Sequence, residues 1–198
     1  CAGLFGQDLR DPVVAELMSL FARAWNDLGR DLMERFGGSY TRLVEAADGS
    51  AARLVEILDA QPFFHDGASH DGRDVPFYKR AQILASDLAL ALPGEDWGRF
   101  DDLGRLTIFA DNLVPHVLRV DGILALDPDL AARIEREELL DAGSTEEVEI
   151  RACAVHAVER LVDLLRARGQ AATARDLDVY LWTRGQAASY KAPARRHR

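Results

Sequence analysis

Apolar residues recur at helical spacing along most of the chain, and this periodicity constrains the fold more than any other feature. The longest run begins at Asp11-Pro12, an N-cap followed by proline at the first helical position, and stops at Gly37-Gly38. Its apolar positions are Val14, Leu17, Phe21, Trp25, Leu28, Leu32 and Phe36. We interpret this stripe as core, because an amphipathic helix buries its apolar face.

The same periodicity, bounded by capping residues, predicts further helices. They cover Tyr40–Ala47, Ala51–Leu58, Phe77–Leu92, Asp127–Leu139, Glu146–Arg168 and Thr173–Trp182. The segment Phe63–Pro76, rich in glycine, proline and polar residues, is predicted to be a loop, and no stretch alternates as a β-strand does. The sequence therefore predicts an all-α fold, a single helical domain over residues 1–198 with a basic, irregular tail from Ala187 to Arg198.

Composition narrows the classes of partner. At 198 residues the chain is long enough to bury a core. Its net charge of −9 weighs against a nucleic-acid-binding face, which needs clustered cations. Two cysteines give no disulfide framework, and no apolar run approaches the roughly 18–20 residues that span a bilayer. We expect a cytoplasmic protein with no membrane contact. Because the first residue is Cys1 rather than Met, we also expect an upstream portion to be missing.

Three stretches carry charged residues in apolar settings. Asp102 and Asp111 flank an apolar run within Phe100–Arg119, and carboxylates placed in this way are costly to bury without partners. Lys79 lies in the first turn of the predicted helix Phe77–Leu92, where an anion would be stabilised. Asp178 shares the interior side of the last predicted helix with Leu181 and Trp182. We expect these three stretches to surround one pocket.

Each acid also has a structural alternative. Asp102, Asp111, Glu149 and Asp178 could hold a polar heterocycle, stabilise a developing cation or act in acid–base catalysis. Each could instead cap a helix or pair with an arginine such as Arg105, Arg119 or Arg151. Glu147, predicted to form a capping box with Ser144, is expected on an exposed ion-pair face.

A metal site is the weaker interpretation of the histidines. His65, Asp66, His70 and Asp71 lie in the predicted loop, and their spacing matches no helix-face metal motif. We interpret them as solvated side chains and predict no metal and no cofactor. The sequence also lacks a supported Ser-His-Asp or Cys-His arrangement, which disfavours a covalent acyl mechanism.

Four segments together resemble a known family. They are VPFYKRAQIL (Val75–Leu84), FDDLGRLTIFADNLVPHVLR (Phe100–Arg119), GSTEEVEIRACAVHAV (Gly143–Val158) and LDVYLW (Leu177–Trp182), and ERFGGSY (Glu34–Tyr40) also fits. In this order and spacing the chain resembles the queuosine salvage protein family from about Leu4 onward. The resemblance implies a helical fold distantly similar to helix–hairpin–helix DNA glycosylases. Independently, Asp141-Ala142-Gly143 between two predicted helices looks like the joint of a helix–hairpin–helix, although a short glycine turn is also a common joint between helices.

The resemblance also implies an activity, hydrolysis of the N-glycosidic bond of queuosine 5′-monophosphate to queuine and ribose 5-phosphate. It implies that Phe109 stacks on the base, that Asp111 accepts hydrogen bonds from it, and that Asp178 stabilises the sugar cation or steers the attacking water. It places Lys79 at the 5′-phosphate. Weaker candidates for lining the pocket are Asp102, Tyr180 and Trp182.

The family also carries an N-terminal helical portion that is not present here, and we expect that portion to complete the pocket. Two alternatives stay open. The first is a base-excision glycosylase that acts on nucleic acid, which the net charge of −9 disfavours. The second is a non-catalytic helical interaction module, which would present a stripe-like apolar surface rather than a closed pocket.

Overall fold

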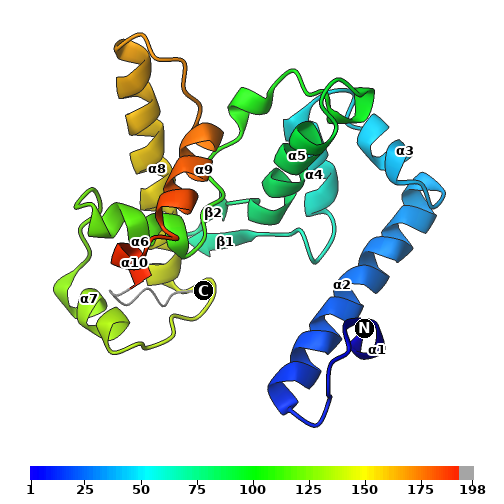
Figure 1. Cartoon of the computed structure of the whole chain (residues 1–198), viewed down its shortest axis with the longest axis horizontal. Helices are drawn as coiled ribbons and strands as arrows, with labels where there is room; N and C mark the ends of the chain where they lie inside the picture. Colours follow the sequence, from blue (N-terminus) through cyan, green and yellow to red (C-terminus); the bar gives the residue numbers. More distant parts are fainter. Residues whose placement is uncertain (192–198) are drawn as a thin grey trace.

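The computed structural model describes residues 1–191 and is predominantly helical, which confirms the predicted fold class (Figure 1). The α-helices are α1 Ala2–Phe5, α2 Pro12–Phe36, α3 Tyr40–Glu45, α4 Ala51–Asp59, α5 Lys79–Ala91, α6 Leu113–Val120, α7 Pro128–Glu135, α8 Thr145–Ala167, α9 Ala174–Arg184 and α10 Ala188–Lys191. Two 3-10 turns, η1 Asp96–Gly98 and η2 Leu103–Arg105, precede α6. Within residues 1–191, no helix is both long and apolar enough to cross a membrane.

The helix starts follow the capping residues. The Asp11 carboxylate accepts a hydrogen bond from the Val13 amide at the start of α2, and Ser50 does the same for Arg53 in α4. Thr173 and Asp176 form a reciprocal capping box at the start of α9. The tail prediction is partly wrong, because its residues 188–191 form α10, while residues 192–198 lie outside the described part of the chain.

The prediction of a strand-free loop at Phe63–Pro76 is wrong. Gly67–His70 (β1) pairs antiparallel with Arg73–Pro76 (β2), and His70 lies opposite Arg73. The turn between them is Asp71-Gly72, and both residues have positive φ angles, 49° and 71°. Asp-Gly is the preferred pair for a two-residue hairpin turn because the backbone of both residues must adopt that conformation. The signal for the hairpin was therefore present in the sequence.

Two large hydrophobic cores lie side by side, and the chain between residues 106 and 110 crosses from one to the other. A third, smaller cluster is formed by Ile134, Leu140 and Ile150. The first lies among α2, α3, α4 and α5, and includes Leu32, Phe36, Leu43, Leu54, Leu58, Ala81, Ala85, Phe100 and Leu106. The second lies among α6, α8, α9 and α10, and includes Ile108, Val114, Val117, Leu118, Val148, Val158, Val162, Leu181 and Tyr190. Figure 1 shows the hairpin β1–β2 between these two groups of helices.

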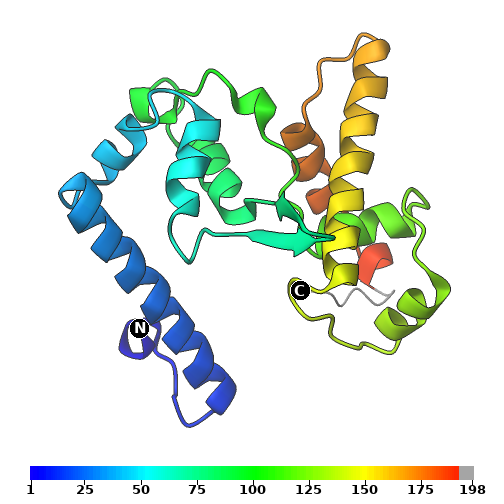
Figure 2. The ribbon, with the colours of Figure 1, turned by 180° about the vertical axis from the view of Figure 1, so that it is seen from behind.

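The apolar stripe of α2 is not core along its N-terminal half, contrary to the prediction. Leu17 is 45% exposed and Trp25 is 50% exposed, whereas Leu32 and Phe36 at the other end are buried. Figure 2 shows the N-terminal half projecting away from the two cores, with only α1 beside it. There the Phe5 ring lies 5.7 Å from the Trp25 ring. Amphipathic spacing shows which face of a helix is apolar, but another element must still cover that face.

The connection between α7 and α8 is longer than the predicted hairpin joint. α7 ends at Glu135 rather than Leu139, and Glu137 takes a left-handed conformation with φ 63°. Residues 136–144 then lead into α8, so Asp141-Ala142-Gly143 forms only the last part of a loop. The similarity to helix–hairpin–helix glycosylases stays a prediction.

Candidate active site

A pocket of about 400 Å³ lies near the junction of the two cores. Its lining residues are Asp66, Lys79, Arg80, Ala110, Asp111, Asn112, Ala142, Glu147 and Arg151. Two of the predicted site residues, Lys79 and Asp111, are among them. A larger hollow of about 500 Å³ beside η1 contains none of the predicted site residues. We therefore take the smaller pocket, which contains Lys79 and Asp111, as the candidate site.

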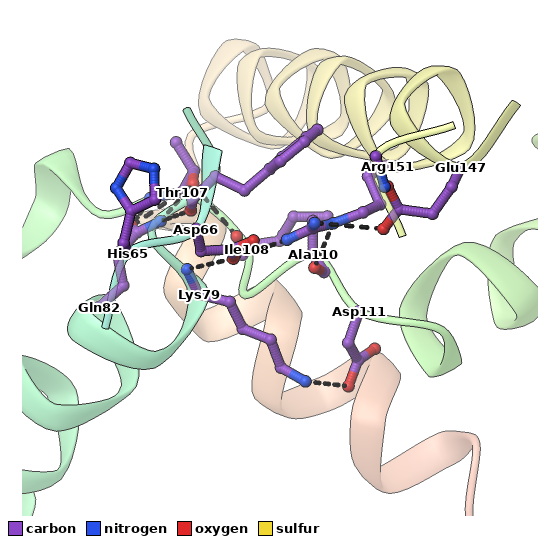
Figure 3. Close-up of polar contacts among 12 residues, drawn as sticks. His65, Asp66, Lys79, Gln82, Thr107, Ile108, Ala110, Asp111, Glu147 and Arg151 are labelled. Carbon is purple, nitrogen blue, oxygen red and sulfur yellow. Dashed lines mark hydrogen bonds and ion pairs between the residues drawn. The ribbon is translucent and has the colours of Figure 1, made fainter. Parts of the chain in front are cut away.

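Lys79 and Asp111 form an ion pair in this pocket, with 3.4 Å between Nζ and Oδ2 (Figure 3). The other carboxylate oxygen, Oδ1, accepts hydrogen bonds from the Leu113 amide at 2.7 Å and the Val114 amide at 3.3 Å. Asp111 therefore caps α6 with one oxygen and presents the second to the pocket. One carboxylate can thus serve both predicted roles, capping a helix and binding a ligand.

Asp178 is buried on α9, with 5% of its surface exposed. Its Oδ1 accepts a hydrogen bond from the Phe109 amide at 2.8 Å, which ties α9 to the segment that crosses between the cores. Burial raises the pKa of Asp178 to about 6. The negative charge of Asp111 raises the pKa further, while the Phe109 hydrogen bond and Lys79 oppose the shift. Asp178, Asp111 and Lys79 are thus electrostatically coupled.

Asp66 occupies the position at which the sequence suggested an anion. Its main-chain carbonyl accepts from the amides of Phe77 and Tyr78, and its carboxylate accepts from the Lys79 amide at 2.9 Å. Tyr78 takes a left-handed conformation with φ 54°, a costly geometry for a bulky residue. A phosphate at the first amide of α5 would have to displace this carboxylate. The cationic side chains that line the pocket, Lys79 among them, are therefore better placed to bind an anion than the helix end.

Two expectations about the acids of α8 are reversed. Glu147 is buried, pairs with Arg151 at 3.2 Å and accepts a hydrogen bond from the Gly143 amide at 3.1 Å. Glu149, expected in an apolar setting, is exposed and lies 3.4 Å from His70. Ser144 caps α8 as predicted by accepting from the Glu147 amide, but the Glu147 carboxylate does not return the bond and turns toward the pocket.

The other predicted site residues do not line this pocket. They are Asp178, Phe109, Asp102, Tyr180 and Trp182. Asp102 caps α4, accepting from the Ser50 hydroxyl at 2.8 Å and from the Ala52 amide at 3.3 Å. Tyr180 is 59% exposed and Trp182 is 50% exposed, and neither lines the pocket. Phe109 is half-buried, and its amide rather than its ring is fixed by Asp178.

Within residues 1–191, no group of three or more His, Cys, Asp or Glu side chains is arranged to hold a metal ion. The loop residues that suggested one have other partners. His65 pairs with Asp59 at 3.1 Å, and Asp66 with Arg151 at 2.7 Å.

Fold and site together define a predominantly helical protein in which carboxylates and a lysine from separate segments meet at one pocket. A family model described as "Queuosine salvage protein" matches residues 4–198, and the chain belongs to that family. This confirms the resemblance that the sequence motifs carried.

Curated relatives from several organisms are each named queuosine 5′-phosphate N-glycosylase/hydrolase. The protein from Sphaerobacter thermophilus is 49% identical over 166 residues, which cover 83% of this chain and 51% of that protein. The Dictyostelium discoideum protein is 36% identical over 190 residues, covering 96% of this chain and 57% of the relative. The Bos taurus protein is 37% identical over 169 residues, covering 81% and 50%. The chain spans about half the length of the curated relatives it matches.

Proposed function

We propose that this chain provides the catalytic part of a queuosine 5′-phosphate N-glycosidase, which hydrolyses the N-glycosidic bond and releases queuine and ribose 5-phosphate. The observation that carries the proposal is that the buried Asp178 carboxylate holds the Phe109 amide, two residues before Asp111 of the Lys79–Asp111 ion pair. The names of the curated relatives support the same reaction.

Asp178 acts in the chemical step. Cleaving the bond between the sugar and the base builds positive charge on the sugar, and a carboxylate in a water-poor site stabilises that charge strongly. The pKa of about 6 keeps Asp178 mainly ionised at pH 7. The same carboxylate is also able to orient the attacking water.

Lys79 and Asp111 exchange partners when substrate binds. N–H groups of the base take the place of the Lys79 ammonium at Asp111 Oδ2, and the 5′-phosphate becomes the new partner of Lys79. Phe109, next to Ala110 of the pocket lining, packs its ring against the base. The substrate thus provides a partner for the Lys79 ammonium and for the Asp111 carboxylate, which pair with each other when the substrate is absent.

The N-terminal portion of the family fold completes the pocket by packing against the exposed face of α2. Two observations support this: the relatives are about twice as long as this chain, and the N-terminal half of the apolar stripe of α2 lies in solvent. The same stripe favours the second candidate function, a helical interaction module. An interaction module would need none of the pocket chemistry, so activity separates the two candidates.

The partner is a small molecule rather than nucleic acid, since the net charge of −9 opposes phosphate-backbone binding. Cys1 and Cys153 are both free thiols, and we place the protein in the reducing cytoplasm on that basis.

The test is to incubate the protein with queuosine 5′-monophosphate and to measure released queuine by mass spectrometry. Two forms are needed: the chain alone, and the chain joined to the N-terminal portion of the Sphaerobacter thermophilus relative. Queuine release by the joined form supports the proposal. If neither form releases queuine while the intact relative does under the same conditions, the proposal is wrong.

A further inference from the structure

One buried arginine, Arg151 of α8, contacts three separate parts of the pocket (Figure 3). Its Nε donates to the Ala110 carbonyl at 3.0 Å, its Nη1 to Glu147 Oε1 at 3.2 Å, and its Nη2 to Asp66 Oδ2 at 2.7 Å. The guanidinium also lies over the Phe77 ring, 3.8 Å from the centroid. The side chain is 10% exposed, so these contacts are largely shielded from water.

Two of these contacts link Arg151 to the Lys79–Asp111 pair through a single intermediate residue each. Ala110, whose carbonyl Arg151 holds, directly precedes Asp111. Asp66, whose carboxylate Arg151 holds, also accepts the hydrogen bond from the Lys79 amide. Arg151 therefore connects the backbone of one charged residue to the backbone of the other, although the two lie on different segments.

Stability alone does not account well for this arrangement. Burying one guanidinium between two carboxylates has a large desolvation cost, and such clusters are often no more stabilising than apolar side chains of similar size. The same two segments are already joined by Gln82, which accepts from the Thr107 amide at 2.8 Å and donates to the Thr107 hydroxyl at 3.0 Å. Arg151 adds orientation at the pocket itself.

We propose that Arg151 is a positioning residue, which sets the placement of Lys79 relative to Asp111 through Asp66 and Ala110. This rests on the proposed function for its catalytic consequence, but its structural part does not. The role requires arginine, because a planar fork of donors reaches three acceptors in different directions, whereas a lysine ammonium on a flexible stem cannot hold the same geometry.

The variants are Arg151→Met, Arg151→Lys and a matched control, Arg133→Met. Arg133 also bridges two acids, Glu138 at 3.2 Å and Glu146 at 2.9 Å, but it lies half-exposed on α7 outside the pocket lining. In the form joined to the N-terminal portion, both Arg151 variants should lower kcat/KM at least tenfold, and the control should stay within twofold. Arg151→Lys keeps the positive charge and tests the geometry if Arg151→Met does not fold.

A double-mutant cycle with Lys79→Ala separates positioning from general stabilisation. If Arg151 acts through the Lys79–Asp111 pair, Arg151→Lys should lower kcat/KM by much less in the Lys79→Ala background than in the parent. Equal losses in both backgrounds would overturn the proposal, as would parent-like kinetics of Arg151→Lys.

Amide hydrogen exchange of the chain alone tests the inference independently of activity. Exchange at the Lys79 and Leu113 amides should be at least tenfold faster in Arg151→Lys than in the parent, with no change in Arg133→Met. Unchanged exchange at both amides would overturn the positioning role, whether or not the enzyme assay succeeds. An inactive parent with the expected exchange pattern would count against the proposed function alone.

Discussion

At the scale of single residues, the site depends on which acids become buried. Sequence reasoning singled out Asp178, which is buried, and Lys79 and Asp111, which line the pocket, because an acid or lysine beside apolar neighbours is a visible local pattern. Their catalytic and binding roles stay predictions. It assigned the wrong exposure to Glu147, which is buried, and to Glu149, which is exposed. Helical spacing alone does not show which of the two side chains is buried beside a cation. The deciding partner of Glu147 is Arg151, whose own burial depends on contacts with Asp66 and Ala110 that are distant in sequence.

Asp178 should lower the stability of the protein at neutral pH. Its pKa is raised to about 6 in the folded state, so between about pH 4 and pH 6 the folded state binds more protons than the unfolded state does. The contribution of this group to stability therefore falls as pH rises through that window. Asp178→Asn should raise the free energy of unfolding at pH 8 by up to about 3 kcal/mol, at 1.36 kcal/mol for each pKa unit.

Urea unfolding of parent and variant at pH 5 and pH 8 measures this effect. The difference in unfolding free energy between Asp178→Asn and the parent should be larger at pH 8. An identical pH dependence of both proteins would mean that Asp178 does not titrate in this window.

Asp111 should discriminate the base. In Asp111→Asn the amide oxygen still caps α6, but the group at Oδ2 no longer accepts from two donors or pairs with Lys79. We expect a loss of about 1–3 kcal/mol in queuine affinity, measured by calorimetry on the joined form. Asp127→Asn is the matched control, because Asp127 caps α7 away from the pocket. Equal affinities of parent and Asp111→Asn would remove Asp111 from the base site.

At the scale of elements, helices with clear caps were predicted within a few residues, but the helices α1, α6 and α10, the hairpin β1–β2 and the exposure of α2 were not predicted. The hairpin β1–β2 was missed although Asp71-Gly72 marks its turn, because the strands are short and polar. The exposure of α2 was missed because a periodic apolar stripe predicts that a face is covered without showing what covers it. The hairpin was therefore a local signal that was overlooked, whereas the exposure of α2 depends on the relation between elements.

The exposed stripe of α2 should contribute little to the stability of this chain. Replacing Leu17 of the stripe and Leu20, one helical turn further along α2, by glutamine should change the free energy of unfolding by less than about 0.5 kcal/mol for each residue, because both side chains are nearly half-exposed. Leu54→Ala in the first core should cost about 2–5 kcal/mol. Thermal and urea unfolding check both values.

The same Leu17→Gln, Leu20→Gln variant should fail to bind the N-terminal portion of the Sphaerobacter thermophilus relative when that portion is added as a separate chain. Calorimetry measures this binding. Parent-like binding by the variant would place the partner surface elsewhere.

At the scale of the whole molecule, the site depends on the junction of two cores. The segment between Leu106 and Ala110 starts in one core and ends in the other. Both ends are therefore anchored, and the Phe109 amide and the Ala110 carbonyl are held where Asp178 of α9 and Arg151 of α8 bind them. No local pattern predicts this junction, because it follows from the packing of helices that are distant in sequence.

The most direct test of the account is the turnover rate of Asp178→Asn, made in the form joined to the N-terminal portion. Asparagine preserves the size of the side chain and its hydrogen bond from the Phe109 amide, and removes only the charge. We expect substrate affinity close to that of the parent and a rate of queuine release lower by about a hundredfold or more. A variant that releases queuine at the parent rate would contradict the assignment of Asp178 to the chemical step.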